Sequence, residues 1–247
     1  MNPFFIALTF LTIIPVPGLK HIDENLLSKS SSCFPAVGAI IGGILLLFCK
    51  LLHCLFPFRP SITAALLLVL WVLITGALHL DGLADTFDGV AGGITIEDRL
   101  RIMKDTHIGT FGVVAVILLL ILKYNLLLNL EGLKLTAALF FSPILARWGL
   151  VVLMSTSPYA GKKESMGKLF MEKITPAYLA VATASILAAS VLSPRLFFLF
   201  LLPLTLLSIV ALRAFFLKKL GGITGDCLGA ACELIELVLL FILSLPF

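Results

Sequence analysis

The sequence predicts an all-α fold, a polytopic transmembrane helical bundle of about seven spans. Of its 247 residues, 60% are hydrophobic and only 13% are charged, and the mean hydropathy of +1.13 exceeds that of ordinary soluble domains. Crossing a hydrocarbon core of about 30 Å takes about 20 mainly apolar residues, and several stretches approach that length. Because no internal repeat or low-complexity linker divides the chain, residues 1–247 are expected to form a single integral-membrane domain.

Seven apolar stretches are expected to cross the bilayer. They cover residues 34–56, 61–80, 108–128, 133–154, 175–193, 196–217 and 228–247. Before them, the apolar segment from Pro3 to Pro17 is shorter than a comfortable span and contains two prolines near its end, Pro15 and Pro17. An interfacial or re-entrant segment is therefore expected at the N-terminus.

The basic residues predict an orientation. One side of the membrane would carry Arg59, Lys134 and Arg195, and the other side would carry a larger group. By the positive-inside rule, the larger group faces the cytoplasm. It comprises Lys20, Lys29, Arg99, Arg101, Lys104, Lys162, Lys163, Lys168, Lys173, Lys218 and Lys219. Topology thus accounts for the net charge of +4, and no nucleic-acid partner is expected.

A cluster of acidic residues follows the second span, in the segment HLDGLADTFDGVAGG. Asp81, Asp85 and Asp88 stand at positions i, i+4 and i+7, which places three carboxylates on one face if the helix continues through them. A divalent cation relieves their repulsion, and hard oxygen ligands shared with a phosphate favour Mg²⁺. These aspartates are the predicted catalytic and metal-binding acids, and Gly82 would let a phosphate approach the backbone. The alternative is a solvated cap at the end of a transmembrane helix.

Basic residues follow this cluster in the segment RLRIMKDTHIGTFG. Arg99, Lys104 and His107 are candidates to bind phosphate oxygens. The alternative is flanking charge of the positive-inside kind, which is the favoured interpretation for Arg101.

The last span begins with a second acidic group, in the segment GGITGDCLGAACELIE. A charge near the centre of a spanning helix costs about 2.5–3.5 kcal/mol, so it usually faces a partner or a polar cavity. Asp226 and Glu233 are seven residues apart and nearly stacked on one helical face. With Gly225 they could complete the substrate site, and Glu233 could act as a general base. Arg147 lies inside an apolar span and could share a substrate phosphate, or it could form a structural ion pair with Glu233.

Taken in order, these motifs resemble the cobalamin synthase family, also called adenosylcobinamide-GDP ribazoletransferase. The resemblance runs almost end to end, through ALTFLTIIPVP, FPAVGAIIGG, HLDGLADTFDG, IMKDTHIGTFG, the Ala146–Arg147 pair and GGITGDCLGAACELIEL. It implies transfer of the phosphocobinamide group of adenosylcobinamide-GDP to the 5′-hydroxyl of α-ribazole, and related members also accept α-ribazole 5′-phosphate. The products would be adenosylcobalamin, or its 5′-phosphate, and GMP.

The resemblance also implies a setting for the reaction. Asp81, Asp85 and Asp88 would bind Mg²⁺, and Gly225, Asp226 and Glu233 would belong to the same catalytic surface. The site would face the cytoplasm from the inner membrane of a bacterium or archaeon. A homo-oligomer, or a complex with other late cobalamin-pathway enzymes, is compatible with the family.

Two alternatives come from other classes of protein. A phospholipid-forming CDP-alcohol phosphotransferase also uses spaced aspartates at a membrane face, but it expects a DG-x-x-AR pattern, and here Ala84 is followed by Asp85. A secondary transporter could use Arg147 and Glu233 as an ion path. That interpretation predicts inverted repeats and a midplane site, and the sequence shows no repeat.

Overall fold

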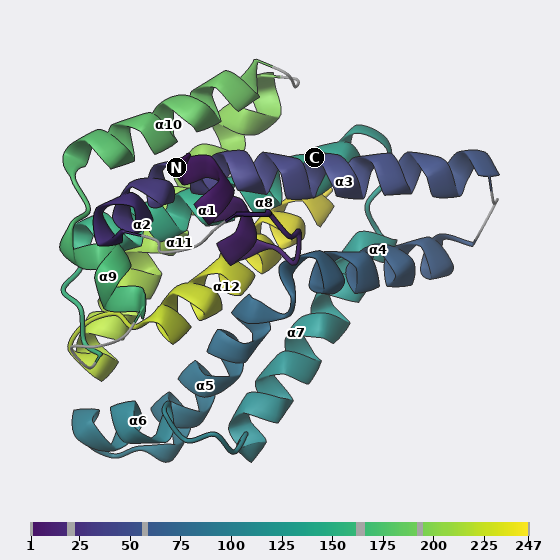
Figure 1. Ribbon diagram of the computed structural model, residues 1–247. Coiled ribbons are helices and arrows are strands. Elements are labelled where there is room, and N and C mark those ends of the chain that lie inside the picture. The colour runs from purple at the N-terminus through teal and green to yellow at the C-terminus, as the bar shows by residue number, and fades with distance from the viewer. Residues whose placement is uncertain (1, 19–22, 56–58, 162–165, 192–194, 247) are drawn as a thin grey trace.

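The computed structural model describes residues 2–18, 23–55, 59–161, 166–191 and 195–246, and within them it confirms the all-α fold (Figure 1). The only extended pairing in these residues is an isolated parallel bridge between Tyr159 and Ile223. The helices are α1 (Pro3–Leu11), α2 (Glu24–Ser30), the short 3₁₀ helix η1 (Ser31–Cys33), α3 (Phe34–Leu55), α4 (Pro60–Thr75), α5 (Leu78–Gly92), α6 (Ile96–Ile102), α7 (Thr110–Leu128), α8 (Gly132–Thr156), α9 (Met166–Glu172), α10 (Pro176–Ser190), α11 (Arg195–Leu220) and α12 (Gly225–Ser244).

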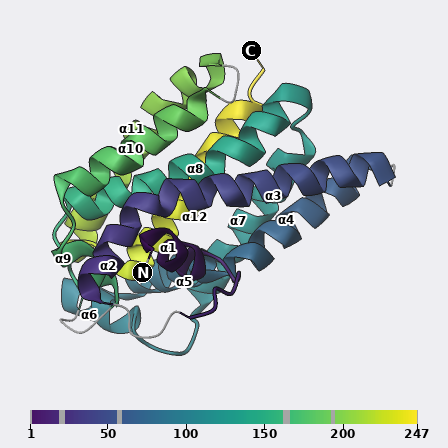
Figure 2. The ribbon, with the colours of Figure 1, turned by 45° about the horizontal axis from the view of Figure 1, so that its top comes forward.

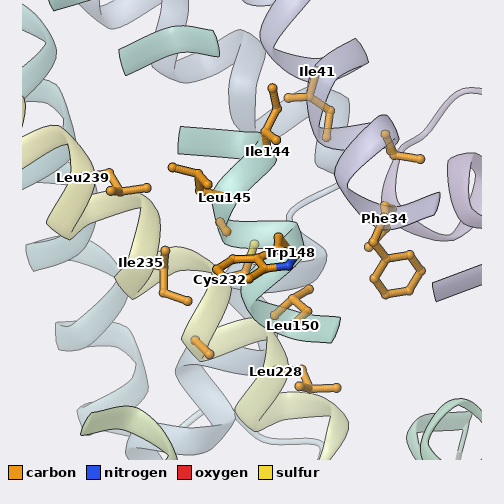
Figure 3. Close-up of a cluster of buried hydrophobic side chains, with 14 of the residues drawn as sticks. Phe34, Ile41, Ile144, Leu145, Trp148, Leu150, Leu228, Cys232, Ile235 and Leu239 are labelled. Carbon is orange, nitrogen blue, oxygen red and sulfur yellow. The ribbon is translucent and has the colours of Figure 1, made fainter. Parts of the chain in front are cut away.

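Helix α8 forms the centre of the bundle, packed against both α3 and α12 (Figure 2). A Cβ atom at Gly38 of α3 would lie 2.5 Å from the carbonyl oxygen of Pro143, and one at Gly42 would lie 2.9 Å from that of Leu139. Small residues four positions apart let two helix backbones approach closely in a membrane. Figure 3 shows the apolar side chains that fill this core, among them Phe34, Ile41, Ile144, Leu145, Trp148, Leu150, Leu228, Cys232, Ile235 and Leu239.

The predicted count of seven spans is not confirmed. In the described part of the chain, five helices are long and apolar enough to cross a membrane, or six if α4 and α5 count as one broken span. The five are the continuous stretch Glu24–Leu55, α7, α8, the Phe200–Leu220 part of α11, and α12. Helix α10, where residues 175–193 were expected to span, has only 15 helical residues, fewer than a crossing needs.

The second predicted span, residues 61–80, does not continue as one helix. Helix α4 ends at Thr75, and α5 begins at Leu78 with its axis turned by 87°. Between them Gly76 and Ala77 have φ angles of 59° and 57°. This left-handed conformation ends a helix, and a residue with a Cβ seldom adopts it. The three aspartates therefore share a helix, as predicted, but that helix has a direction of its own.

The N-terminal segment is a short helix packed into the bundle. Helix α1 has nine residues, too few to cross a bilayer. Its Ile6, Ala7 and Leu11 side chains are buried. The backbone N–H of Ile13 donates to the carbonyl of Ile74 at 2.8 Å, which holds the segment beside the end of α4.

Segments predicted to face the cytoplasm gather at one end of the molecule. Figures 1 and 2 both place α2, α6 and α9 at the left. Lys173, just after α9, pairs with Glu24 of α2 at 3.0 Å. This arrangement is compatible with the orientation that the basic residues predict, and that orientation stays a prediction. Of the basic residues used for that prediction, Lys20, Lys162 and Lys163 lie outside the described residues.

Candidate active site

A cavity of about 370 Å³ lies where α1, α5, α8, α9 and α12 meet. One part of its wall is polar and is formed by His79, Asp81, Lys104, Tyr159, Thr224 and Asp226. Another part is apolar and includes Phe10, Phe34, Phe170, Leu150, Met154 and Leu228. The cavity can therefore hold a molecule that has both an apolar and a charged or hydroxylated end.

Five of the predicted site residues line this cavity. They are Asp81, Gly82, Lys104, Gly225 and Asp226, and they come from three separate segments of the chain. The structure thus brings Asp81 together with Lys104 of the basic segment and with the start of the last span. Asp85, which is half-buried, and Asp88, which is buried, do not line the cavity.

Two glycines press α5 against α12 beside the cavity. A Cβ atom at Gly82 would lie 2.8 Å from the carbonyl oxygen of Asp226, and one at Gly229 would lie 3.2 Å from the Cα of Gly82. A Cβ atom in a protein almost never lies as close as 2.8 Å to another heavy atom. A larger residue at Gly82 would therefore push the two helices apart. This close contact places Asp81 and Asp226 near each other at the cavity wall.

The start of α12 is held open toward the cavity. Thr224 caps the helix, because its Oγ1 accepts the N–H of Cys227 at 3.3 Å. The preceding residue is also fixed, since the N–H of Ile223 donates to the carbonyl of Pro158 at 2.9 Å. A Cβ atom at Gly225 would meet nothing within 4 Å. The N-terminus of a long helix attracts anions, so a phosphate group is favoured here.

Asp88 has a different environment from Asp81. Its carboxylate accepts the N–H of Gly109 at 2.7 Å and that of Gly112 at 2.8 Å, at the N-terminus of α7. Such charge-assisted bonds are strong, and a carboxylate is favoured at a helix N-terminus. A Cβ at either glycine would overlap the carboxylate. Asp88 therefore joins α5 to α7, and both of its oxygens already accept hydrogen bonds.

The remaining carboxylates suit a hard divalent cation. Asp85 is repelled by Asp226, Asp81 and Asp88, and Asp226 is repelled by Asp81. Across the described ranges, no three Asp, Glu, His or Cys side chains converge closely enough to hold a metal ion alone. Mg²⁺ typically takes only one or two carboxylates and completes its shell with water and substrate phosphates. The residues present fit that ion in the company of a phosphorylated substrate.

Two of the predicted phosphate-binding cations lie away from the cavity. Arg99 donates to the carbonyl oxygens of Gly93 at 3.1 Å and Lys219 at 2.9 Å, so it ties α6 to the end of α11. His107 is exposed and contacts Asp105. The pKa of the Asp105 carboxyl lies below its ordinary value, because it accepts the backbone N–H of His107 at 3.0 Å and contacts its ring Nδ1 at 2.8 Å.

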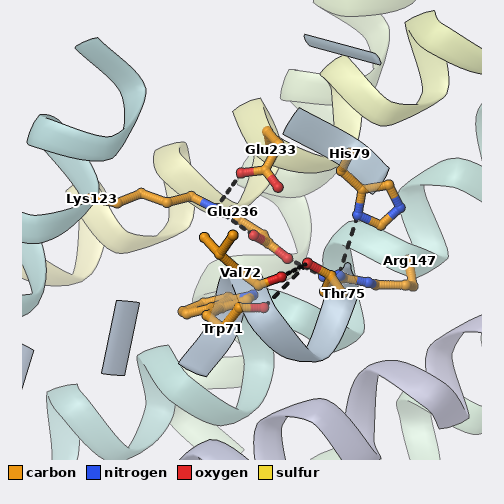
Figure 4. A network of polar contacts seen from close by, with 8 residues as sticks. All are labelled: Trp71, Val72, Thr75, His79, Lys123, Arg147, Glu233 and Glu236. Atoms are coloured by element: carbon orange, nitrogen blue, oxygen red, sulfur yellow. Dashed lines mark hydrogen bonds and ion pairs between the residues drawn. The ribbon is translucent and has the colours of Figure 1, made fainter. Parts of the chain in front are cut away.

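A buried network of charged side chains lies next to the cavity (Figure 4). Lys123 of α7 contacts Glu233 at 2.6 Å and Glu236 at 2.5 Å, and Arg147 of α8 pairs with Glu236. Two cations thus balance two carboxylates, which is the usual way for charges to persist inside a membrane. Arg147 also donates to Nδ1 of His79 at 3.4 Å, and His79 lines the cavity.

This network changes the interpretation of two predicted site residues. Glu233 and Arg147 do not line the cavity, and each is engaged with a buried partner. An ion pair for Arg147 was one of the two sequence interpretations, but the carboxylate it contacts belongs to Glu236, one helical turn beyond Glu233.

Sequence reasoning missed Lys123 and His79. A single lysine inside the apolar stretch VVAVILLLILKYN was a usable signal, because it needs a carboxylate partner and the last span offers two. The aromatic part of the wall was also missed, since the chain contains 19 phenylalanines and no spacing distinguishes Phe10, Phe34 and Phe170 from the rest.

The fold and the site define a class: an all-helical, multi-pass membrane protein with an acidic and aromatic cavity between its helices. The family described as cobalamin-5-phosphate synthase matches residues 3–244. This chain belongs to that family, which confirms the resemblance of its motifs.

Similar proteins with curated names agree with this assignment. The chain is 37% identical to an adenosylcobinamide-GDP ribazoletransferase of Clostridium acetobutylicum, over 93% of this chain and 90% of the relative. It is 38% identical to the protein of that name from Fusobacterium nucleatum, over 98% and 96% of the two chains. For the one from Acetivibrio thermocellus the identity is 39%, over 91% and 90%. No solved structure matches the chain.

Proposed function

We propose that this protein joins adenosylcobinamide-GDP to α-ribazole, or to α-ribazole 5′-phosphate, giving adenosylcobalamin, or its 5′-phosphate, and GMP. Membership of the family across residues 3–244 and the names of the relatives support this activity. The structural observation that carries it is the cavity lined both by two carboxylates, Asp81 and Asp226, and by aromatic side chains. That combination suits the transfer of a phosphoryl group to an aromatic nucleoside.

The reaction is a displacement at phosphorus. A ribose hydroxyl oxygen of α-ribazole forms a bond to the phosphorus atom that carries cobinamide, and the bond from that phosphorus to the bridging oxygen breaks. The attacking group is not the 5′-hydroxyl expected from the sequence, because α-ribazole 5′-phosphate carries its phosphate at that position and the product retains it. The bridging oxygen leaves with GMP. The proton of the attacking hydroxyl passes to one of the two carboxylates that line the cavity, Asp81 or Asp226, and the other stays ionised and available to a cation.

Other groups of the chain offset the negative charge of the phosphates. Lys104 lines the cavity, and so does Gly225 at the N-terminus of α12, where the helix favours negative charge. Glu233, the general base that the sequence suggested, is bonded to Lys123 and lies outside the cavity wall, so we do not assign it the proton transfer.

Mg²⁺ is the proposed cofactor, and the carboxylates of the cavity that would hold it are those of Asp81 and Asp226. The repulsion between Asp226 and Asp81 supports this choice. Of the other two aspartates predicted from the sequence, Asp88 already binds the N–H groups of α7, and Asp85 does not line the cavity. The chemistry that Mg²⁺ supplies when bound is neutralisation of the pyrophosphate charge.

The proposed setting is the cytoplasmic face of a bacterial or archaeal inner membrane. The positive charges of α2, α6 and the segment around α9 support that orientation. The large amphipathic corrinoid would approach along the membrane surface. A homo-oligomer or a complex with other late cobalamin-pathway enzymes remains a proposal that rests on the family.

The test is direct. The protein would be purified, reconstituted in liposomes and supplied with adenosylcobinamide-GDP, α-ribazole and Mg²⁺, and both GMP and cobalamin would be followed by chromatography. We expect the two products in equal amounts. A folded, reconstituted sample that forms neither would contradict the proposal and would favour the CDP-alcohol phosphotransferase or transporter interpretation.

A further inference from the structure

Three phenylalanines from distant parts of the chain meet at the cavity. The ring centroids of Phe10 (α1) and Phe170 (α9) are 4.7 Å apart, and those of Phe34 (α3) and Phe170 are 5.7 Å apart. Phe34 and Phe170 are each only 2% exposed, while Phe10 is half-buried. All three line the cavity, and we call them the aromatic wall.

The size of the cavity limits what can occupy it. Pockets for drug-sized ligands have volumes of about 300–1,000 Å³, and this cavity, at about 370 Å³, is near the lower end. A nucleoside is of that size. A corrin macrocycle with its side chains, its adenosyl ligand and a nucleotide is several times larger and must remain mostly outside.

The chemistry of the wall selects between the aromatic groups of the two substrates. The base of α-ribazole is a dimethylated benzimidazole, a flat and mostly apolar ring system that gains from packing on phenylalanine faces. The guanine of adenosylcobinamide-GDP carries a polar edge of donors and acceptors. Against Phe34, Phe170 and the neighbouring Leu150 and Met154, those groups would lose their hydrogen bonds to water without replacement.

We propose that the aromatic wall is the binding subsite for the base of α-ribazole, and that it sets the specificity of the enzyme for the acceptor nucleoside. This inference rests on the proposed function. With the base on the wall, the ribose extends toward the part of the cavity lined by Asp81 and Asp226, which is where its attacking hydroxyl has to be. The corrinoid pyrophosphate then reaches the hydroxyl from the open side.

The experiment compares two leucine substitutions on the same helix. Phe10→Leu alters the wall, and Phe5→Leu is the matched control, because Phe5 is 43% exposed and does not line the cavity. We expect Phe10→Leu to raise KM for α-ribazole roughly ten-fold, the scale of losing one aromatic stacking partner. KM for adenosylcobinamide-GDP should stay within about two-fold, and Phe10→Trp, which keeps an aromatic face, should retain the KM for α-ribazole.

A binding measurement separates this inference from the proposed function. Radiolabelled α-ribazole alone would be titrated into the reconstituted wild type and the three variants, and we expect weaker binding only in Phe10→Leu. Unchanged α-ribazole binding and KM in Phe10→Leu, or a rise confined to KM for adenosylcobinamide-GDP, would overturn the subsite assignment while the activity stands. Absence of turnover in a folded wild type would instead contradict the proposed function.

Discussion

Lys123 of α7 and Glu233 of α12 form an ion pair inside the helical bundle, with 2.6 Å between Nζ and Oε2. Lys123 contacts Glu236 as well, and Arg147 of α8 binds Glu236 from the other side. Lys123 also lies 5.0 Å from the ring centroid of Trp71 on α4. Charged groups of α7, α8 and α12 thus meet in one network, next to the helix pair that carries Asp81 and Asp226.

Removing Lys123 should destabilise the protein strongly. In Lys123→Met, Glu233 loses the ion pair with Lys123 while Glu236 still pairs with Arg147, so among the described residues two buried carboxylates share one cation. Breaking a buried pair in this way costs about 3–5 kcal/mol. The measurement is thermal unfolding in detergent, with the exposed Lys50→Met as the control. Pairing Lys123→Met with Glu233→Gln should recover part of the loss, and an equal loss in the double variant would mean that the two residues are not coupled.

The separation of Glu233 from the cavity predicts different effects for two acids on α12. Asp226→Asn should reduce kcat by about 10²–10⁴-fold, because Asp226 lines the cavity and is assigned to metal binding or proton transfer. Glu233→Gln should keep most of its activity at a temperature where it is folded. Turnover of both variants at saturating substrate decides this. A Glu233→Gln enzyme that is folded and inactive would restore Glu233 as the base.

Close packing at Gly82 predicts that a single methyl group disturbs both fold and site. In Gly82→Ala the new Cβ would lie 2.8 Å from the carbonyl oxygen of Asp226, so α5 and α12 must move apart. We expect a loss of about 1–3 kcal/mol in stability and a fall in activity. Gly43→Ala is the matched control, because a Cβ there meets nothing within 4 Å. Equal behaviour of the two variants would argue against the close contact.

Asp88 is predicted to act through structure. Asp88→Asn keeps one acceptor oxygen and loses the charge that binds the N–H groups of Gly109 and Gly112. We expect a stability loss of about 1.5–3 kcal/mol, the value of hydrogen bonds to a charged group. The Mg²⁺ concentration for half-maximal turnover should stay close to that of the wild type. A large rise in that concentration would instead return Asp88 to the metal-binding set.

Metal removal tests the proposed ion directly. EDTA should abolish formation of GMP and cobalamin, and added Mg²⁺ or Mn²⁺ should restore it, because both accept hard oxygen ligands. Asp81→Asn should need more Mg²⁺ for half-maximal turnover, since it removes a charge from the proposed ligand set. Full turnover in EDTA would exclude the metal assignment.

The sequence predicted the class of fold and all the charged residues of the cavity wall, Asp81, Lys104 and Asp226. Long apolar stretches can satisfy their backbone hydrogen bonds in a bilayer only as helices or closed barrels, and their length here indicates helices. The acids of HLDGLADTFDG and GGITGDCLGAACELIE were identifiable because a charge beside or inside an apolar span is costly and usually marks an ion pair or a functional site. Asp81, Gly82, Lys104, Gly225 and Asp226 indeed line one cavity.

Other features depend on contacts between helices that no local pattern reveals. The break at Gly76 and Ala77 lies inside a stretch that reads as one span, and the partners of Lys123 and Asp88 lie on other helices. By itself the sequence determined a helical membrane protein with acids at two helix starts, because hydropathy and spacing are local properties. Only the tertiary structure decided that Asp226 faces the cavity, that Glu233 faces Lys123, and that three phenylalanines form one wall, because side-chain partners are chosen by packing across the bundle.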